Sequence, residues 1–151
     1  MGISPRSTAM VALTALDVVG GQAALGGPAA SSRDLIAAVR RGFPVRTIEH
    51  VIESGRMTLA EIDELVLPRK TLSHRRKIGT LTTEQSDRLM RAARVIAEAE
   101  VTFGSQDKAG RWLRRPTSAL DGEKPLALLD TGEGAAQVEA LLGRIAHGIA
   151  A

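Results

Sequence analysis

The chain has 151 residues, a formal net charge of +3 and 44% apolar residues, with only 2% aromatic. It has no cysteine, which excludes disulfides, thiolate metal sites and thiol catalysis, and its few histidines are too scattered to suggest a metal site. A chain of this length forms one domain or two small ones.

Residues 1–31 are rich in small residues and close with GGQAALGGPAASS. Because this segment has few large apolar anchors, we expect it to be a flexible leader or linker, in which residues near 8–18 could form a weak helix. Its apolar part, residues 8–19, lacks the basic start and the cleavage site of a signal peptide. No apolar run in the chain reaches membrane-spanning length, so we expect a cytoplasmic protein without a membrane partner.

Beyond the leader, the spacing of apolar residues predicts helices and no sheet, so the expected fold class is all-α. The first helix should begin at a cap formed by Ser31 or Ser32 and end near residue 41. The second should cover about residues 44–54. Thr58 and Glu61 have the spacing of a capping box, which predicts the start of a third helix.

The next segment, LPRKTLSHRRKI at residues 67–78, concentrates the positive charge of the chain. It holds five arginines and lysines and no acid, so the rest of the chain carries about −2. Pro68 suits a first helical position, Leu72 would be the one buried anchor, and Gly79 would end the helix. A solvated basic face is the alternative interpretation of such a run.

Together with the capped helix before it, the basic helix forms a helix-turn-helix pattern, which is typical of DNA binding. Basic side chains release counterions from phosphates, and Thr, Ser, Arg and His side chains reach base edges. Arg75 or Arg76 would read guanine, while Lys70 and Lys77 would hold phosphates. The candidate DNA-binding residues are Arg69, Lys70, Thr71, Ser73, His74, Arg75, Arg76 and Lys77.

A longer helix is expected over about residues 82–103, with Thr82 and Gln85 at capping-box spacing. Acid–arginine pairs four residues apart should lie on its exposed face. Arg88, Arg91 and Arg94 are expected to be solvated, and contact with phosphates is the alternative. A short helix should then run from about residue 106 to 115 and place Trp112 in the core. The basic residues on this short helix are expected to be solvated, namely Arg111, Arg114 and Arg115. As an alternative, Arg114 and Arg115, just before Pro116, could reach acids on a partner.

The last helix should start at a cap formed by Asp130 or Thr131 and reach the chain end. Its apolar stripe consists of Val138, Leu141, Leu142, Ile145 and Ile149. An ordinary core stripe explains most of these residues. A terminal helix in so small a region can nevertheless have more apolar surface than its own chain covers, which suggests a protein partner.

The C-terminal third resembles the toxin-binding domain of Xre/MbcA/ParS-type antitoxins. The residues that carry the resemblance are Phe103–Gly104, Ala109, Trp112–Leu113, Pro116, Leu120, Gly122, Pro125–Leu126, Asp130–Thr131, Gly134, Val138, Leu142–Gly143–Arg144–Ile145 and Gly148. The TLSHRR run at residues 71–76 and the Asp87–Arg88–Leu89 helix resemble the Xre-type domain that precedes it in this family. The resemblance covers about Asp34 to the C-terminus, and the leader at 1–31 lies outside it. It implies a helix-turn-helix domain at 32–104 and a toxin-binding domain at 105–151.

The resemblance implies an antitoxin of a type II toxin–antitoxin system. Its expected partner is a RES-domain toxin that degrades NAD or transfers its ADP-ribose, and the antitoxin would obstruct the NAD site of that toxin. The Xre-type domain, as a homodimer, would bind operator DNA and repress its own operon. Where the family often has consecutive arginines in the basic run, this chain has His74.

On this hypothesis the toxin-binding residues are Leu142, Arg144, Ile145, His147, Gly148 and Ile149. Arg144 would pair with acids of the toxin's cleft or stand in for a cationic ligand group, or else it would interact with the dipole of its own helix. The alternative function is a stand-alone repressor whose C-terminal helix only dimerises it. An enzyme is not expected, because no nucleophile is paired with a base, and neither a cofactor nor a metal is implied.

Overall fold

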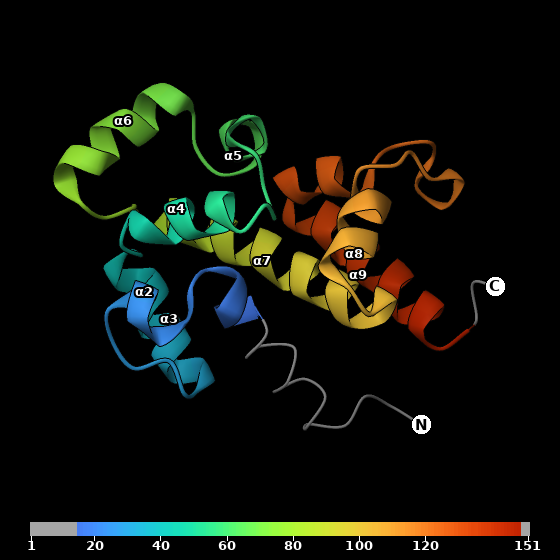
Figure 1. Cartoon of the computed structure of the whole chain (residues 1–151), viewed down its shortest axis with the longest axis horizontal. Helices are drawn as coiled ribbons and strands as arrows, with labels where there is room; N and C mark the ends of the chain where they lie inside the picture. Colours follow the sequence, from blue (N-terminus) through green and yellow to red (C-terminus); the bar gives the residue numbers. More distant parts are fainter. Residues whose placement is uncertain (1–14, 149–151) are drawn as a thin grey trace.

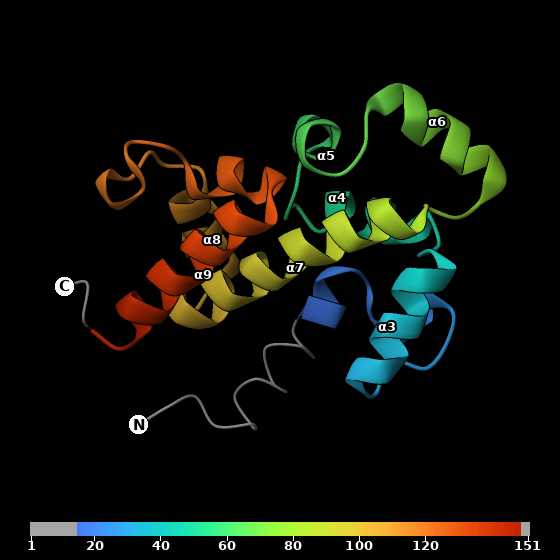
Figure 2. The same ribbon diagram turned by 180° about the vertical axis from the view of Figure 1, so that it is seen from behind.

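The computed structural model describes residues 15–148 (Figure 1, Figure 2). Within this range the regular structure is helical, and extended backbone pairs only in one antiparallel bridge between Pro44 and Thr80. The predicted all-α fold class is therefore confirmed. None of the helices in the described range combines the length and the apolar character that a membrane-spanning segment needs.

Eight α-helices with bounds inside the described range follow one another along the chain. They are α2 (Gly21–Leu25), α3 (Ser32–Arg41), α4 (Arg46–Glu53), α5 (Leu59–Leu65), α6 (Arg69–Ile78), α7 (Thr83–Phe103), α8 (Gln106–Leu113) and α9 (Gly132–Ala146). Residues 15–18 are helical as well. Two 3-10 helices, η1 (Ser118–Leu120) and η2 (Pro125–Asp130), lie in the predicted turn-rich segment before α9.

The 21-residue helix α7 is the central helix of the molecule. Helix α3 packs against it near its start, and α5, α8, α9 and η2 pack against it further along (Figure 1). Its buried face contains four alanines, whose small side chains let neighbouring helices approach closely. The same helix therefore supports both the N-terminal and the C-terminal parts of the protein.

Residues 15–31 are not the flexible leader that we expected. Ala15, Val18 and Val19 have no exposed surface, Leu25 is 1% exposed, and α2 packs against α4. Our expectation relied on the lack of large apolar anchors, but small side chains bury as completely when they meet a closely fitting neighbour. The remaining part of the expected leader, residues 1–14, lies outside the described residues.

The connections around α4 are held by contacts that sequence spacing does not reveal. The buried Ser86 accepts a hydrogen bond from the Phe43 backbone N–H at 2.8 Å and donates one to the Thr82 carbonyl at 2.8 Å. Gly42 ends α3 with φ 93°, and a Cβ there would lie 2.2 Å from the Leu81 carbonyl oxygen. Only glycine fits at this crossing of two chain segments.

Several predicted helix ends move by a few residues. Helix α4 begins at Arg46, and Pro44 pairs instead with Thr80 in the antiparallel bridge. Pro68 is the N-cap of α6 and not its first helical residue. Helix α9 does not reach the chain end, since it closes at Ala146 with His147 as its C-cap.

Candidate functional site

Helices α5 and α6 form the predicted helix-turn-helix. The capping box of Thr58 and Glu61 is present at the start of α5, as predicted. The turn between the helices is buried through Val66 and Leu67. Leu72, the predicted anchor of α6, is 1% exposed and fixes that helix on the core.

The start of α6 is held by a side chain that the sequence did not point to. The backbone N–H of Arg69 donates a hydrogen bond to Asp63 Oδ1 at 2.8 Å. Pro68 itself provides no side-chain cap. Asp63, six residues before Arg69, thus takes the place of the usual capping residue. No local sequence rule covers this spacing.

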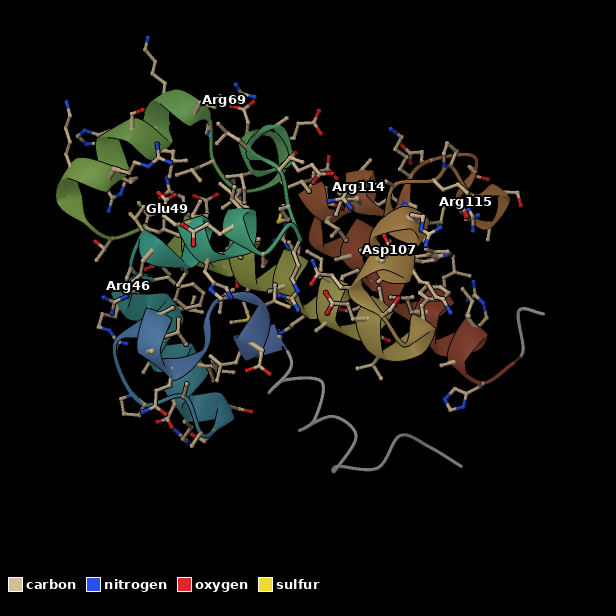
Figure 3. All side chains as sticks on the ribbon, in the orientation of Figure 1. Arg46, Glu49, Arg69, Asp107, Arg114 and Arg115 are labelled. Atoms are coloured by element: carbon tan, nitrogen blue, oxygen red, sulfur yellow. The ribbon has the colours of Figure 1, made fainter. Side chains whose placement is uncertain are left out.

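Most of the predicted DNA-binding residues face solvent. Lys70, Ser73 and His74 are exposed, and Lys77 follows on the same face one turn later. Figure 3 shows Arg69 at the start of the exposed helix. Thr71 and Arg75 are only partly exposed.

The two arginines expected to read guanine are already engaged within the chain. Arg75 Nε donates to the Thr80 carbonyl at 2.7 Å and so holds the chain that leaves α6. Arg76 Nε pairs with Glu49 of α4 at 2.9 Å, and both side chains are close to half exposed. Arg75 has a structural task, while the solvated Arg76–Glu49 pair is weak enough to exchange for a phosphate.

The predicted toxin-binding residues in and after the last turns of α9 differ in their exposure. Leu142 has no exposed surface and packs in the protein's own core, so it positions the helix. Ile145 is partly buried, whereas Arg144, His147 and Gly148 are exposed. Ile149 lies outside the described residues.

The start of α9 is fixed where η2 passes beneath it. Thr131 is the N-cap, as one of our two predictions had it, and its hydroxyl accepts from the Gly134 N–H at 2.9 Å. A Cβ on Gly134 would lie 2.0 Å from the Leu128 carbonyl oxygen. Glycine at this position therefore sets the close approach of the two segments and the direction of the helix.

The two candidate surfaces do not form one site. Helices α6 and α9 lie near opposite ends of the molecule, with α7 running between them (Figure 1). DNA on α6 and a protein on the C-terminal end of α9 would therefore occupy separate surfaces. No group of acids and histidines within residues 15–148 is arranged to hold a metal ion.

Arg114 connects the helix-turn-helix part of the chain to the C-terminal part. It is therefore not solvated, as we had predicted it to be. Its guanidinium pairs with both carboxylate oxygens of Glu61 at 2.8 Å and donates to the Arg56 carbonyl at 3.1 Å. Burial alone would raise the pKa of Glu61, but the hydrogen bonds from Arg114 and Thr58 hold it below its ordinary value. Figure 3 shows Arg114 between α8 and α5.

Arg114 lines a cleft with a volume of about 560 Å³, and two further contacts lie in the same cleft. Arg56 pairs with Glu100 of α7 at 2.8 and 3.0 Å, and Gln106 Nε2 donates to the Ser54 carbonyl at 2.6 Å. Each charged group that lines the cleft has an ion-pair partner, which for Arg114 is Glu61 beside the cleft. The cleft therefore serves as a polar junction between the helix-turn-helix part and the C-terminal part.

Trp112 is a core residue, as predicted. It is 7% exposed, and its ring centroid lies 5.3 Å from that of Phe103 at the end of α7. This contact joins the C-terminal end of α7 to α8 and so sets the position of the C-terminal part.

Comparisons with known proteins identify both parts. A family model described as the antitoxin Xre-like helix-turn-helix domain matches residues 34–94. A second, described as the antitoxin Xre/MbcA/ParS C-terminal toxin-binding domain, matches residues 98–148. The two matches meet within α7, which both parts share.

Relatives match over most of the chain. An antitoxin Xre of Pseudomonas putida is 37% identical over 79% of this chain and 75% of its own length. An antitoxin Xre of Yersinia enterocolitica is 34% identical over 83% of this chain and 86% of its own. A Prs ADP-ribosylating antitoxin of Sphingobium is 29% identical over 79% of this chain and 82% of its own. The resemblance seen in the sequence is thus confirmed, and the chain belongs to the Xre family of antitoxins, a non-enzymatic family with a helix-turn-helix domain and a C-terminal toxin-binding domain.

Proposed function

We propose that this cytoplasmic antitoxin binds and neutralises a RES-domain toxin that acts on NAD, by occluding the toxin's active site, and that it represses its own operon as a homodimer on operator DNA. The observation that carries the proposal is the match of residues 98–148 to a toxin-binding domain, beside a matched helix-turn-helix domain. The relative named for ADP-ribosylation supports a toxin that uses NAD.

The exposed C-terminal end of α9 is the proposed toxin-binding surface. Arg144 and His147 are exposed there, and the partly buried Ile145 places an apolar group beside them. Such a centre with a polar rim has the make-up of a protein–protein contact. Leu142 supports the surface from below, while the contribution of Ile149 stays a prediction.

The outer face of α6 is the proposed DNA-binding surface. Ser73 and His74 lie at its centre and are the residues that we propose to contact base edges. Lys70 and Lys77 flank them and would hold phosphates. Since Arg75 holds Thr80, we propose no base contact for it.

Co-expression with the product of the adjacent gene tests the toxin-binding proposal. Arg144→Glu should abolish co-purification and the rescue of growth, because it reverses the charge at the proposed contact. Lys108→Glu is the matched control, since it reverses an exposed cation on α8 and should change neither result. Full rescue by Arg144→Glu would remove this surface from the proposal.

A promoter-binding assay at several salt concentrations tests the DNA proposal. Lys70→Ala should weaken binding to all sequences alike and reduce the salt slope by about one. His74→Ala should mainly reduce the preference for the operator over other DNA. If the protein binds its promoter but no neighbouring gene product, the alternative of a stand-alone repressor takes precedence.

A further inference from the structure

An apolar groove runs along the contact between α3 and the first half of α7. Its volume is about 560 Å³. The lining residues are Leu35, Ile36, Val39, Arg40, Thr83, Glu84, Asp87, Met90 and Arg94. The groove lies in the part of the chain that matches the helix-turn-helix domain.

Ile36 stands out on the wall of this groove. It is 49% exposed, although the neighbouring Leu35 is 7% exposed and Met90 on the facing helix is 2% exposed. An exposed large apolar side chain next to an apolar groove can insert into an apolar surface of another molecule, which removes it from water. The groove thus provides both a protruding group and a space that accepts one.

The charges around the groove indicate what fits there. Arg40 of α3 and Arg94 of α7 are exposed and make no ion pair within the described residues. Glu84 and Asp87 lie on the same rim, where they pair only with arginines one turn further along α7. Two cations and two acids around one apolar centre make a surface that is complementary to itself.

A two-fold symmetric dimer requires such self-complementarity. In that arrangement the same patch faces its own copy, so the cations of one protomer meet the acids of the other. A partner of uniform charge would leave one pair of rim residues opposed by like charge. The mixed rim therefore favours a second copy of this chain over a strongly acidic or basic partner.

The position of the groove is compatible with DNA binding. In both views α6 and α3 lie on opposite sides of α7 (Figure 1, Figure 2). A second copy on the α3 side would leave the outer face of α6 open. Helix-turn-helix proteins present two such helices to half-sites about one helical turn apart.

We propose that the groove between α3 and α7 is the homodimer surface of this protein. Ile36 of each protomer enters the groove of the other, between Val39 and Met90. Arg40 and Arg94 face Glu84 and Asp87 of the second copy. This inference rests on the proposed homodimer and assigns it a surface.

Molecular mass in solution tests the surface, with light scattering or sedimentation on the full chain in the absence of DNA and toxin. Ile36→Glu should weaken self-association roughly tenfold or more, because a charge replaces the apolar contact. Val101→Glu is the matched control: Val101 is 62% exposed on α7 but lies outside the groove, and its variant should remain dimeric. Circular dichroism of each variant confirms that it is folded.

Charge reversal provides a second test that does not depend on Ile36. Arg40→Glu with Arg94→Glu makes the rim acidic, and Glu84→Lys with Asp87→Lys makes it basic. Each double variant alone should be a monomer, whereas an equimolar mixture should form heterodimers. Dimers of both double variants, together with a dimeric Ile36→Glu protein, would overturn the proposal.

A monomeric wild-type chain would also overturn it. If removal of residues 1–14 then produced a dimer, the groove would belong to the chain's own first residues. These measurements need no toxin, so their failure would leave the toxin-binding proposal standing. Conversely, a dimer that fails to shift its promoter would contradict autorepression alone.

Discussion

Glu98 of α7 is a residue whose ionisation the fold changes. Burial and, second, the charge of Glu139 on α9 raise its pKa from 4.5 to about 7. The unfolded chain releases this proton near pH 4.5, while the folded chain keeps it to about pH 7. Because the folded state binds more protons between these values, the free energy of unfolding should fall as the pH rises through this window.

Glu98→Gln should remove this part of the pH dependence. The variant and the wild type should be about equally stable at acidic pH, and the variant should be about 1 kcal/mol more stable above neutrality, a modest figure because solvent screens a half-exposed carboxylate. Urea unfolding on both sides of the window measures the difference. The exposed Glu123→Gln should be neutral throughout. A constant difference between Glu98→Gln and wild type at all pH values would contradict the assignment.

Individual core anchors were easier to predict than charged contacts. Leu72 and Trp112 were recognisable because each is a large apolar residue in a polar stretch, and both are buried. Arg114 was not, since its partner Glu61 is 53 positions away and the contact depends on how two helices meet. Arg75 escaped prediction for a related reason, because its acceptor is the backbone of the following turn.

The helix starts with a capping box were the most predictable elements, because a capping box is a local pattern. Thr58 with Glu61 and Thr82 with Gln85 form the boxes that their spacing indicates. The packing of residues 15–31 could not be inferred in the same way. Small residues give little periodic signal, and their burial depends on a distant surface of α4. The domain division at residue 104 and the roles of the site residues stay predictions.

The cap of α7 should contribute measurably to stability. Thr82→Ala removes the hydroxyl that accepts from the Gln85 N–H at 3.1 Å and should lower the free energy of unfolding by about 1 kcal/mol. Thermal or urea unfolding measures the loss. Thr102→Ala, in the last turn of the same helix, is the matched control and should cost far less because it removes no cap. Equal losses at the two positions would mean that the capping bond contributes nothing specific.

At the scale of the whole molecule, one helix serves two family domains. Residues 34–94 and 98–148 match different domains, yet α7 runs through both. The Arg114–Glu61 and Arg56–Glu100 pairs then join the parts beside that helix. We therefore expect the two parts to unfold together, because melting either one exposes the buried face of α7.

Arg114→Ala tests this coupling. It leaves the largely buried Glu61 without its cation and should lower the free energy of unfolding by about 2 kcal/mol. Arg111→Ala is the matched control from the same helix: its pair with Asp107 is exposed and should contribute less than about 0.5 kcal/mol.

Two probes make the test specific to the whole molecule. The single tryptophan, Trp112, reports on the C-terminal part by fluorescence, and far-ultraviolet circular dichroism reports on all helices. In the wild type both signals should change at the same urea concentration, and Arg114→Ala should shift both together, since α7 still links the parts. A shift of the tryptophan signal alone would contradict this expectation. The two parts would then unfold as independent units, joined in the folded state by the polar junction and not by α7.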